Sequence, residues 1–172
     1  EKDRARVSAP AGSLSFAFEG KEASLELEGE ARWLVEIDGQ EAGTVLSRER
    51  SLYRIAKGLP EGIHRATVSK MTETELGSVS LYGIRADTVK IQAASPRRRI
   101  EFIGDSYTAG FGNIAKDPVS GNAFSTTDAT KSYGALLAQK LDAAFAINAY
   151  SGRGLVQNFM GIAPRWTIPE LY

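Results

Sequence analysis

The sequence predicts two domains of different class: an all-β sandwich of jelly-roll type in residues 1–96, then an incomplete α/β domain with a parallel sheet in residues 97–172. Three observations lead to this prediction. Short apolar runs of period two fill the first part, and a strand–helix–strand pattern fills the second. The second segment is also shorter than the roughly 100–150 residues of a common domain. We therefore expect it to be only the first part of an α/β domain.

Eight short runs with a period of two predict the strands of the sandwich. In the first run, Leu14, Phe16 and Phe18 alternate with small or polar residues. Asp38-Gly39 is a strong signal for a two-residue hairpin, and residues 59–62 predict another turn. Strands at this spacing are typical of an antiparallel sandwich. The predicted strands are 14–18, 25–27, 33–37, 44–46, 52–55, 64–71, 79–84 and 88–91.

The second segment predicts one right-handed βαβ unit. Its strands are residues 100–103 and 146–150, and a helix is expected between Thr130 and Phe145. Thr130 or Asp128 is expected to cap that helix. The apolar face of the predicted helix comprises Tyr133, Leu136, Leu137, Leu141 and Ala144.

Composition excludes several classes of function. The chain has 21 Lys and Arg against 21 Asp and Glu, so it lacks the charge typical of proteins that bind nucleic acid or anionic membranes. No apolar run approaches the roughly 20 residues of a transmembrane helix. Without cysteine, and with one histidine, the sequence predicts no metal site and no cofactor. That histidine, His64, follows a turn in the sandwich and is expected to be structural.

Ser106 is the candidate nucleophile. It follows the predicted strand 100–103, and open α/β sheets bind their ligands at the carboxyl ends of strands. If a helix begins there, its first N–H groups point at an incoming oxyanion. The pattern is not the G-x-S-x-G elbow, because the second glycine is Gly110. Gly-Asp-Ser by itself is equally compatible with an ordinary strand-to-helix turn.

The sequence around this turn resembles the SGNH, or GDSL-like, hydrolases. Residues 100–110 are similar to their first block, an apolar strand with Gly-Asp-Ser and a nearby glycine, and residues 147–152 to their second, a strand ending in Asn-x-x-x-Gly. A sandwich that leads directly into the first block resembles carbohydrate esterase family two. Residues 64–73 and 77–84 look like paired late strands of that sandwich, and residues 167–172 resemble a later segment of the same enzymes.

This resemblance implies a serine esterase that removes acetyl groups from plant polysaccharide such as xylan or mannan, through an acyl-enzyme on Ser106. The backbone N–H groups of Ser106 and Gly152 would form the oxyanion hole, and Asp105 would brace the turn. Tyr107 and Trp166 are weaker candidates for sugar contact, because most aromatic side chains are buried. The resemblance implies no cofactor, an acetylated poly- or oligosaccharide as partner, and a secreted, periplasmic or cell-surface location.

The chain departs from the family in two places. The family's Gly-x-Asn-Asp block and its late histidine are both missing from the sequence. Without a general base, a serine hydroxyl is a poor nucleophile at neutral pH. We therefore expect the histidine on a second polypeptide, or in a carboxyl-terminal portion removed by a nick or a truncation, and expect this chain alone to be inactive. Four asparagines lie in other contexts: Asn113, Asn122, Asn148 and Asn158.

Two alternatives remain open at this point. The chain is also compatible with a non-catalytic carbohydrate-binding protein, in which the sandwich holds the ligand and the Gly-Asp-Ser segment is inert. Within enzymes, an SGNH lipase or thioesterase is the other alternative, although no apolar lid is visible in the sequence.

Overall fold

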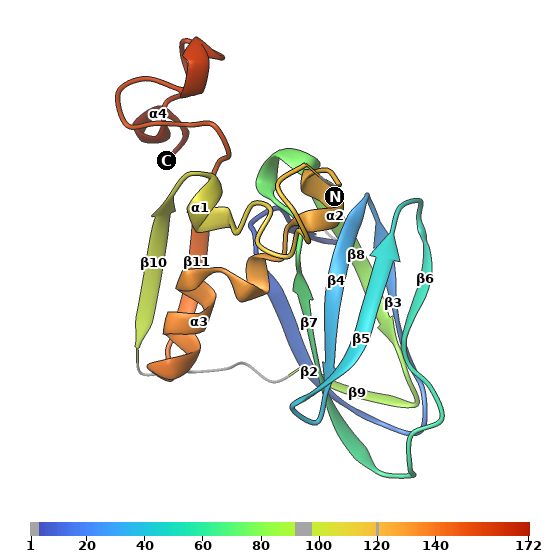
Figure 1. Cartoon of the computed structure of the whole chain (residues 1–172). Coiled ribbons are helices and arrows are strands. Elements are labelled where there is room, and N and C mark those ends of the chain that lie inside the picture. Colours follow the sequence, from blue (N-terminus) through green and yellow to red (C-terminus); the bar gives the residue numbers. More distant parts are fainter. Residues whose placement is uncertain (1–3, 92–97, 120) are drawn as a thin grey trace. The chain divides into compact units, whose positions relative to one another are not determined.

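The computed structural model of the 172-residue chain describes residues 4–91, 98–119 and 121–172. Figure 1 shows their strands and helices. The predicted domain boundary after residue 96 lies outside these residues. No helix among them combines the length and the apolar character needed to cross a membrane.

Chain contacts divide the protein into two compact units, and the division does not fall at one point of the sequence. The first unit is built mainly on residues 12–70 and 77–91, and the second mainly on residues 98–172. Two short segments from the early part of the sequence, Ala9–Ala11 and Met71–Leu76, also belong to the second unit. The second unit is therefore assembled from three parts of the chain.

The first unit contains two antiparallel sheets, ordered β1-β8-β3-β6 and β5-β4-β7-β2-β9 (Figure 1). The eight predicted strands are confirmed as β2 to β9. The additional strand β1 is too short to show a period of two in the sequence, and it pairs with β8. The strands are β1 Ala5–Val7, β2 Ser13–Glu19, β3 Ala23–Glu28, β4 Ala31–Ile37, β5 Gln40–Ser47, β6 Ser51–Ala56, β7 Ile63–Lys70, β8 Val79–Arg85 and β9 Thr88–Ile91.

Alternation along the strands builds one apolar core from both sheets. In β4, Ala31, Trp33, Val35 and Ile37 are buried, while the residues between them are half-buried. The buried set joins side chains of the other sheet, such as Leu25 of β3. Burying one large apolar side chain contributes about 1.5–3 kcal/mol, so a one-residue slip in the pairing of β4 would cost several such contributions.

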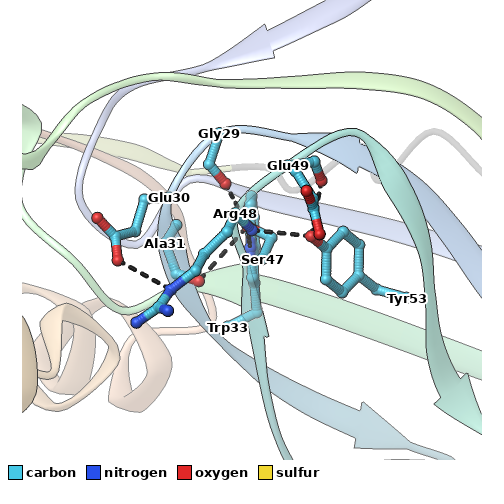
Figure 2. Close-up of polar contacts among 8 residues, drawn as sticks. All are labelled: Gly29, Glu30, Ala31, Trp33, Ser47, Arg48, Glu49 and Tyr53. Carbon is cyan, nitrogen blue, oxygen red and sulfur yellow. Dashed lines mark hydrogen bonds and ion pairs between the residues drawn. The ribbon is translucent and has the colours of Figure 1, made fainter.

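A hydrogen-bond cluster joins the start of β4 to the end of β5 (Figure 2). The buried Trp33 Nε1–H donates to Ser47 Oγ at 2.9 Å, and the Ser47 hydroxyl donates to the carbonyl of Gly29 at 2.7 Å. Beyond it, Tyr53 Oη donates to the Glu49 carbonyl and accepts from the Arg48 N–H. Since the indole N–H has a partner, Trp33 is buried without an unsatisfied donor.

His64 lies beside the predicted hairpin, which is confirmed: Asp38 and Gly39 both have positive φ and connect paired residues of β4 and β5. His64 Nδ1 lies 2.7 Å from Asp38 Oδ2, and Nε2 lies 2.9 Å from the Pro60 carbonyl oxygen. Both partners accept hydrogen bonds, so the doubly protonated ring satisfies both. The hydrogen bond with Asp38, and then that with Pro60, raise the pKa of His64. His64 is structural, as expected.

The second unit contains a two-stranded parallel sheet, β10 (Arg99–Gly104) with β11 (Ala144–Ala149), as predicted. Its core contains Phe102 of β10 and Ile147 of β11, packed among small alanines. The second unit also contains short helices: α1 Ser106–Ala109, α2 Ala123–Thr126, the 3-10 helix η2 Ala129–Lys131, α3 Tyr133–Lys140, the 3-10 helix η3 Phe159–Gly161 and α4 Ile168–Leu171. Another 3-10 helix, η1 Thr74–Leu76, is part of the inserted segment.

The predicted caps and apolar face of the α/β helix were wrong. Ser132 caps α3, whereas Asp128 caps η2 before it. The large apolar side chains expected on the core face, Tyr133, Leu136, Leu137 and Leu141, are 39–54% exposed, and Ala144 belongs to β11.

Small residues of α3 face the core instead: Gly134, Ala135 and Ala138 are buried. The helix backbone lies so close to the sheet that a Cβ on Gly134 would be 2.8 Å from Phe102 Cγ. Close approach of this kind needs small residues at the contact, which explains why Leu136, Leu137 and Leu141 do not form it, while Tyr133 packs edge-on against the Phe102 ring.

The raised pKa of His64 predicts a pH-dependent stability. Its contribution to folding is fully present below the unfolded pKa of about 6.5 and is lost as pH rises through the higher folded pKa. The His64→Gln variant should therefore lose more melting temperature at pH 6 than at pH 9, measured by calorimetry. Glu61→Gln, which removes only an exposed ion pair with Lys21, is the control with a small effect. An equal loss for His64→Gln at both pH values would contradict the assignment.

The contact at Gly134 predicts that replacing this glycine with alanine lowers stability, the opposite of the usual effect in a helix. At an ordinary helical position, Gly→Ala stabilises by about 0.8–1 kcal/mol. Here the methyl group would overlap the Phe102 ring, so Gly134→Ala should destabilise by about 1–3 kcal/mol in urea unfolding. Gln139→Ala, on the exposed side of the same helix, should change stability by less than about 0.5 kcal/mol. Stabilisation by Gly134→Ala would contradict the packing.

Candidate active site

The parallel register of β10 and β11 aligns the ends of the two strands. Gly104, the last residue of β10, pairs with Ala149, the last of β11, and the Tyr150 N–H donates to the Gly104 carbonyl at 3.0 Å. The turns that contain Ser106 and Gly152 therefore begin side by side at one edge of the sheet. Ser106 and Gly152, which are 46 residues apart in the sequence, thus lie in turns at the edge where parallel sheets position ligands.

The turn after β10 places Ser106 at the first position of α1. Asp105 is its N-cap, and the Tyr107 N–H donates to Asp105 Oδ1 at 3.0 Å. Gly104 cannot carry a side chain, because a Cβ there would lie 2.1 Å from Thr108 Oγ1. Asp105 thus caps the start of α1, and Ser106 is half-buried at the first position of this helix.

The turn after β11 needs glycine at residue 152 for two reasons. Gly152 has φ of 76°, in the left-handed region, and a Cβ there would lie 2.9 Å from Ile162 Cδ1. Its carbonyl accepts from the Phe159 N–H at 2.9 Å, which connects the turn to η3. Backbone conformation, close approach and hydrogen bonding together fix the peptide at this position.

The two aromatic candidates are both exposed. Tyr107, next to Ser106 on α1, is 84% exposed, and Trp166 is 60% exposed. Neither side chain is therefore buried, although burial is common for aromatic residues. Sugar contact by either ring stays a prediction, which needs a bound ligand to test it.

The four asparagines that lay outside the family's block each have a structural partner. Asn158 is buried, accepts from the Gly154 N–H and donates to the carbonyls of Ala163 and Arg165. Asn113 exchanges hydrogen bonds with the backbone of Asp128, Asn122 caps α2, and Asn148 donates to Glu101.

The segment Met71–Leu76 reaches this edge of the sheet and was not predicted to do so. Glu73 is 2% exposed and accepts hydrogen bonds from the hydroxyls of Ser151 and Thr127. Thr74 Oγ1 donates to the Ala149 carbonyl at 3.2 Å. The period of two predicts a sandwich strand that ends at residue 71, and the family resemblance extends this strand to residue 73. The polar run Thr-Glu-Thr-Glu, longer than a hairpin turn needs, was the available signal.

No group of three or more His, Asp or Glu side chains in the described part of the chain is arranged to hold a metal ion. This edge of the sheet carries the Ser106 hydroxyl at the start of α1 and the backbone N–H groups of two turns. A hydroxyl at a helix start beside a second, glycine-containing turn is an arrangement suited to acyl transfer.

Comparisons with known proteins identify the family of the chain. The family model of the carbohydrate esterase 2 N-terminal domain matches residues 1–96. An acetylxylan esterase / glucomannan deacetylase of Cellvibrio japonicus is 32% identical over 167 residues, 95% of this chain and 46% of that protein. The cellulase/esterase CelE of Acetivibrio thermocellus is 33% identical over 165 residues, 93% of this chain and 20% of that protein.

A solved structure leads to the same family. A family two carbohydrate esterase from Clostridium thermocellum, in complex with cellohexaose, matches with a TM-score of 0.88 and 28% identity, over 98% of this chain and 56% of that one. The chain spans less than half the length of the two curated relatives. Since the family model covers more than half of this sequence, the chain belongs to carbohydrate esterase family two.

Proposed function

We propose that the protein is a serine esterase that removes acetyl groups from plant polysaccharide of the xylan or mannan type. The observation that carries the proposal is the register that sets the Ser106 turn beside the Gly152 turn. Ser106 Oγ attacks the acetyl carbonyl carbon and loses its proton to a base. The sugar oxygen then leaves with a proton, and water hydrolyses the acetyl–Ser106 ester to acetate.

The oxyanion of the tetrahedral intermediate is bound by the backbone N–H groups of Ser106 and Gly152. One N–H begins α1 and the other lies in the left-handed turn after β11. Removing one oxyanion donor typically costs about 2.7–4 kcal/mol of transition-state stabilisation. Asp105 supports this geometry by holding the start of α1 through the Tyr107 N–H.

The general base is proposed to lie outside residues 1–172, in a carboxyl-terminal portion or on a second polypeptide. His64 is in the first unit, with both ring nitrogens bound to Asp38 and Pro60. The chain spans 46% of its Cellvibrio relative, which supports a further portion. In this proposal residues 1–96 are a jelly-roll sandwich and residues 97–172 begin an SGNH hydrolase domain.

Exposed apolar side chains of the second unit support the same proposal. Leu136 and Leu137 of α3, Ile103 of β10 and Phe145 of β11 are 37–46% exposed, and a two-stranded parallel sheet is normally covered on both faces. A further portion of the α/β domain would cover them. Tyr107 and Trp166 are proposed to contact sugar, the substrate to be an acetylated poly- or oligosaccharide, and the protein to be secreted or at the cell surface.

The nucleophile assignment predicts the effect of Ser106→Ala. In the protein that contains this chain and the proposed portion, kcat on an aryl acetate should fall by at least about 10³-fold, because no acyl-enzyme can form. Ser15→Ala, at an exposed serine of β2, should retain full activity. Residues 1–172 alone should be inactive, and full activity of that fragment would contradict the placement of the base.

Labelling separates this proposal from a non-catalytic carbohydrate-binding protein, an alternative that the relative bound to cellohexaose makes worth testing. A fluorophosphonate should modify Ser106 in the complete protein, as read by peptide mass spectrometry. Binding of xylan without labelling would favour the binding protein. Faster turnover of long-chain acyl esters than of acetyl esters would favour a lipase or thioesterase.

A further inference from the structure

We propose that Glu73 is a positioning residue for the oxyanion donor at Gly152, a role that rests on the proposed esterase function. Glu73 lies on Met71–Leu76, which connects β7 to β8 in the sequence but belongs to the second unit. Two hydrogen bonds connect this segment to the rest of the second unit. The Ala129 N–H donates to the Met71 carbonyl at 2.9 Å, and Thr74 Oγ1 donates to the Ala149 carbonyl.

The Glu73 carboxyl group is buried and both of its oxygens have a hydroxyl donor. Thr127 Oγ1 donates to Oε1 at 3.2 Å, and Ser151 Oγ donates to Oε2. A buried carboxyl group is costly without such partners, so a movement of either hydroxyl is resisted by the loss of its bond. Glu73 therefore holds Ser151 against a fixed part of the second unit.

The carboxyl group of Glu75, on the same segment, lies near the backbone of Ser151. Burial raises the pKa of Glu75, while hydrogen bonds from the backbone N–H groups of Glu75 and Ser151 oppose that rise. Both carboxyl groups of the segment are thus near Ser151, and the hydrogen bond from its hydroxyl to Glu73 is the direct contact.

Holding Ser151 in place also holds the next backbone donor, the N–H of Gly152. The N–H of Gly152 belongs to the planar peptide between Ser151 and Gly152, so the orientation of that N–H depends on how Ser151 is held. Preorganised donors stabilise an oxyanion because they need no reorientation during the reaction. The geometry explains why a segment from the sandwich sequence crosses into the second unit at this edge of the sheet.

Kinetics of the complete esterase, this chain with the proposed carboxyl-terminal portion, test the role. Glu73→Gln and Ser151→Ala should each lower kcat on an aryl acetate by about 10–100-fold and leave KM within about twofold, because the donor is misplaced rather than the substrate site removed. The double variant should be no slower than the slower single variant, since both changes remove one interaction. If Glu73→Gln does not fold, Ser151→Ala, which deletes one hydroxyl, decides the test.

Asn122→Ala is the matched control in the same unit. It removes the N-cap of α2 and should lower stability while kcat stays unchanged. Amide hydrogen exchange at residues 151 and 152 is measured on each variant, and exchange should be faster in Glu73→Gln than in the control. Wild-type kcat in Glu73→Gln or Ser151→Ala, or multiplicative losses in the double variant, would overturn the positioning role and leave the esterase proposal standing.

Failure of the proposed esterase function can be distinguished from failure of the positioning role of Glu73. If the complete wild-type protein hydrolyses no ester, the proposed function is wrong. Hydrogen exchange alone then tests whether Glu73 fixes the turn at Ser151 and Gly152. Faster exchange at residues 151 and 152 in Glu73→Gln than in Asn122→Ala would support the fixing of this turn by Glu73. Unchanged exchange would overturn it.

Discussion

The parallel pairing of β10 with β11 is the constraint on which the candidate site depends. Backbone hydrogen bonds set Gly104 opposite Ala149, and this register fixes where each strand ends. A shift of one residue would move the nucleophile turn relative to the glycine turn by roughly 3.3 Å, more than a hydrogen bond tolerates. Phe102 and Ile147 pack against the small buried residues of α3, and this packing stabilises the pairing register of β10 and β11. The position of Ser106 therefore follows from packing several residues away.

A buried carboxyl group, that of Glu73, is a second constraint on this edge of the sheet. Glu73 joins the hydroxyls of Thr127 and Ser151, which lie 54 and 78 residues further along the sequence. The family model of the amino-terminal domain matches residues 1–96, the sandwich part of the sequence. Here one of its connections is part of the α/β unit itself. Fold and candidate site are thus coupled through a segment of six residues.

Local patterns were sufficient to predict the strands, the Asp38-Gly39 hairpin and the turn at Ser106, because each depends on residues close in the sequence. The orientation of α3 was predicted wrongly. Its large apolar residues suggested the core face, but close approach to Phe102 selects Gly134, Ala135 and Ala138 instead. The role of Glu73 was missed for another reason: its partners are distant in sequence, and no local period marks a buried carboxyl group.

The central claim is that Ser106 carries the acetyl group during turnover. The most direct measurement is rapid acid quenching of the complete protein with an aryl acetate, followed by peptide mass spectrometry. We expect one acetyl group on the peptide that contains Ser106, formed within the first turnover and lost when substrate is exhausted. Acetylation of a different residue, or sustained turnover with no acetylated peptide at any time, would contradict it.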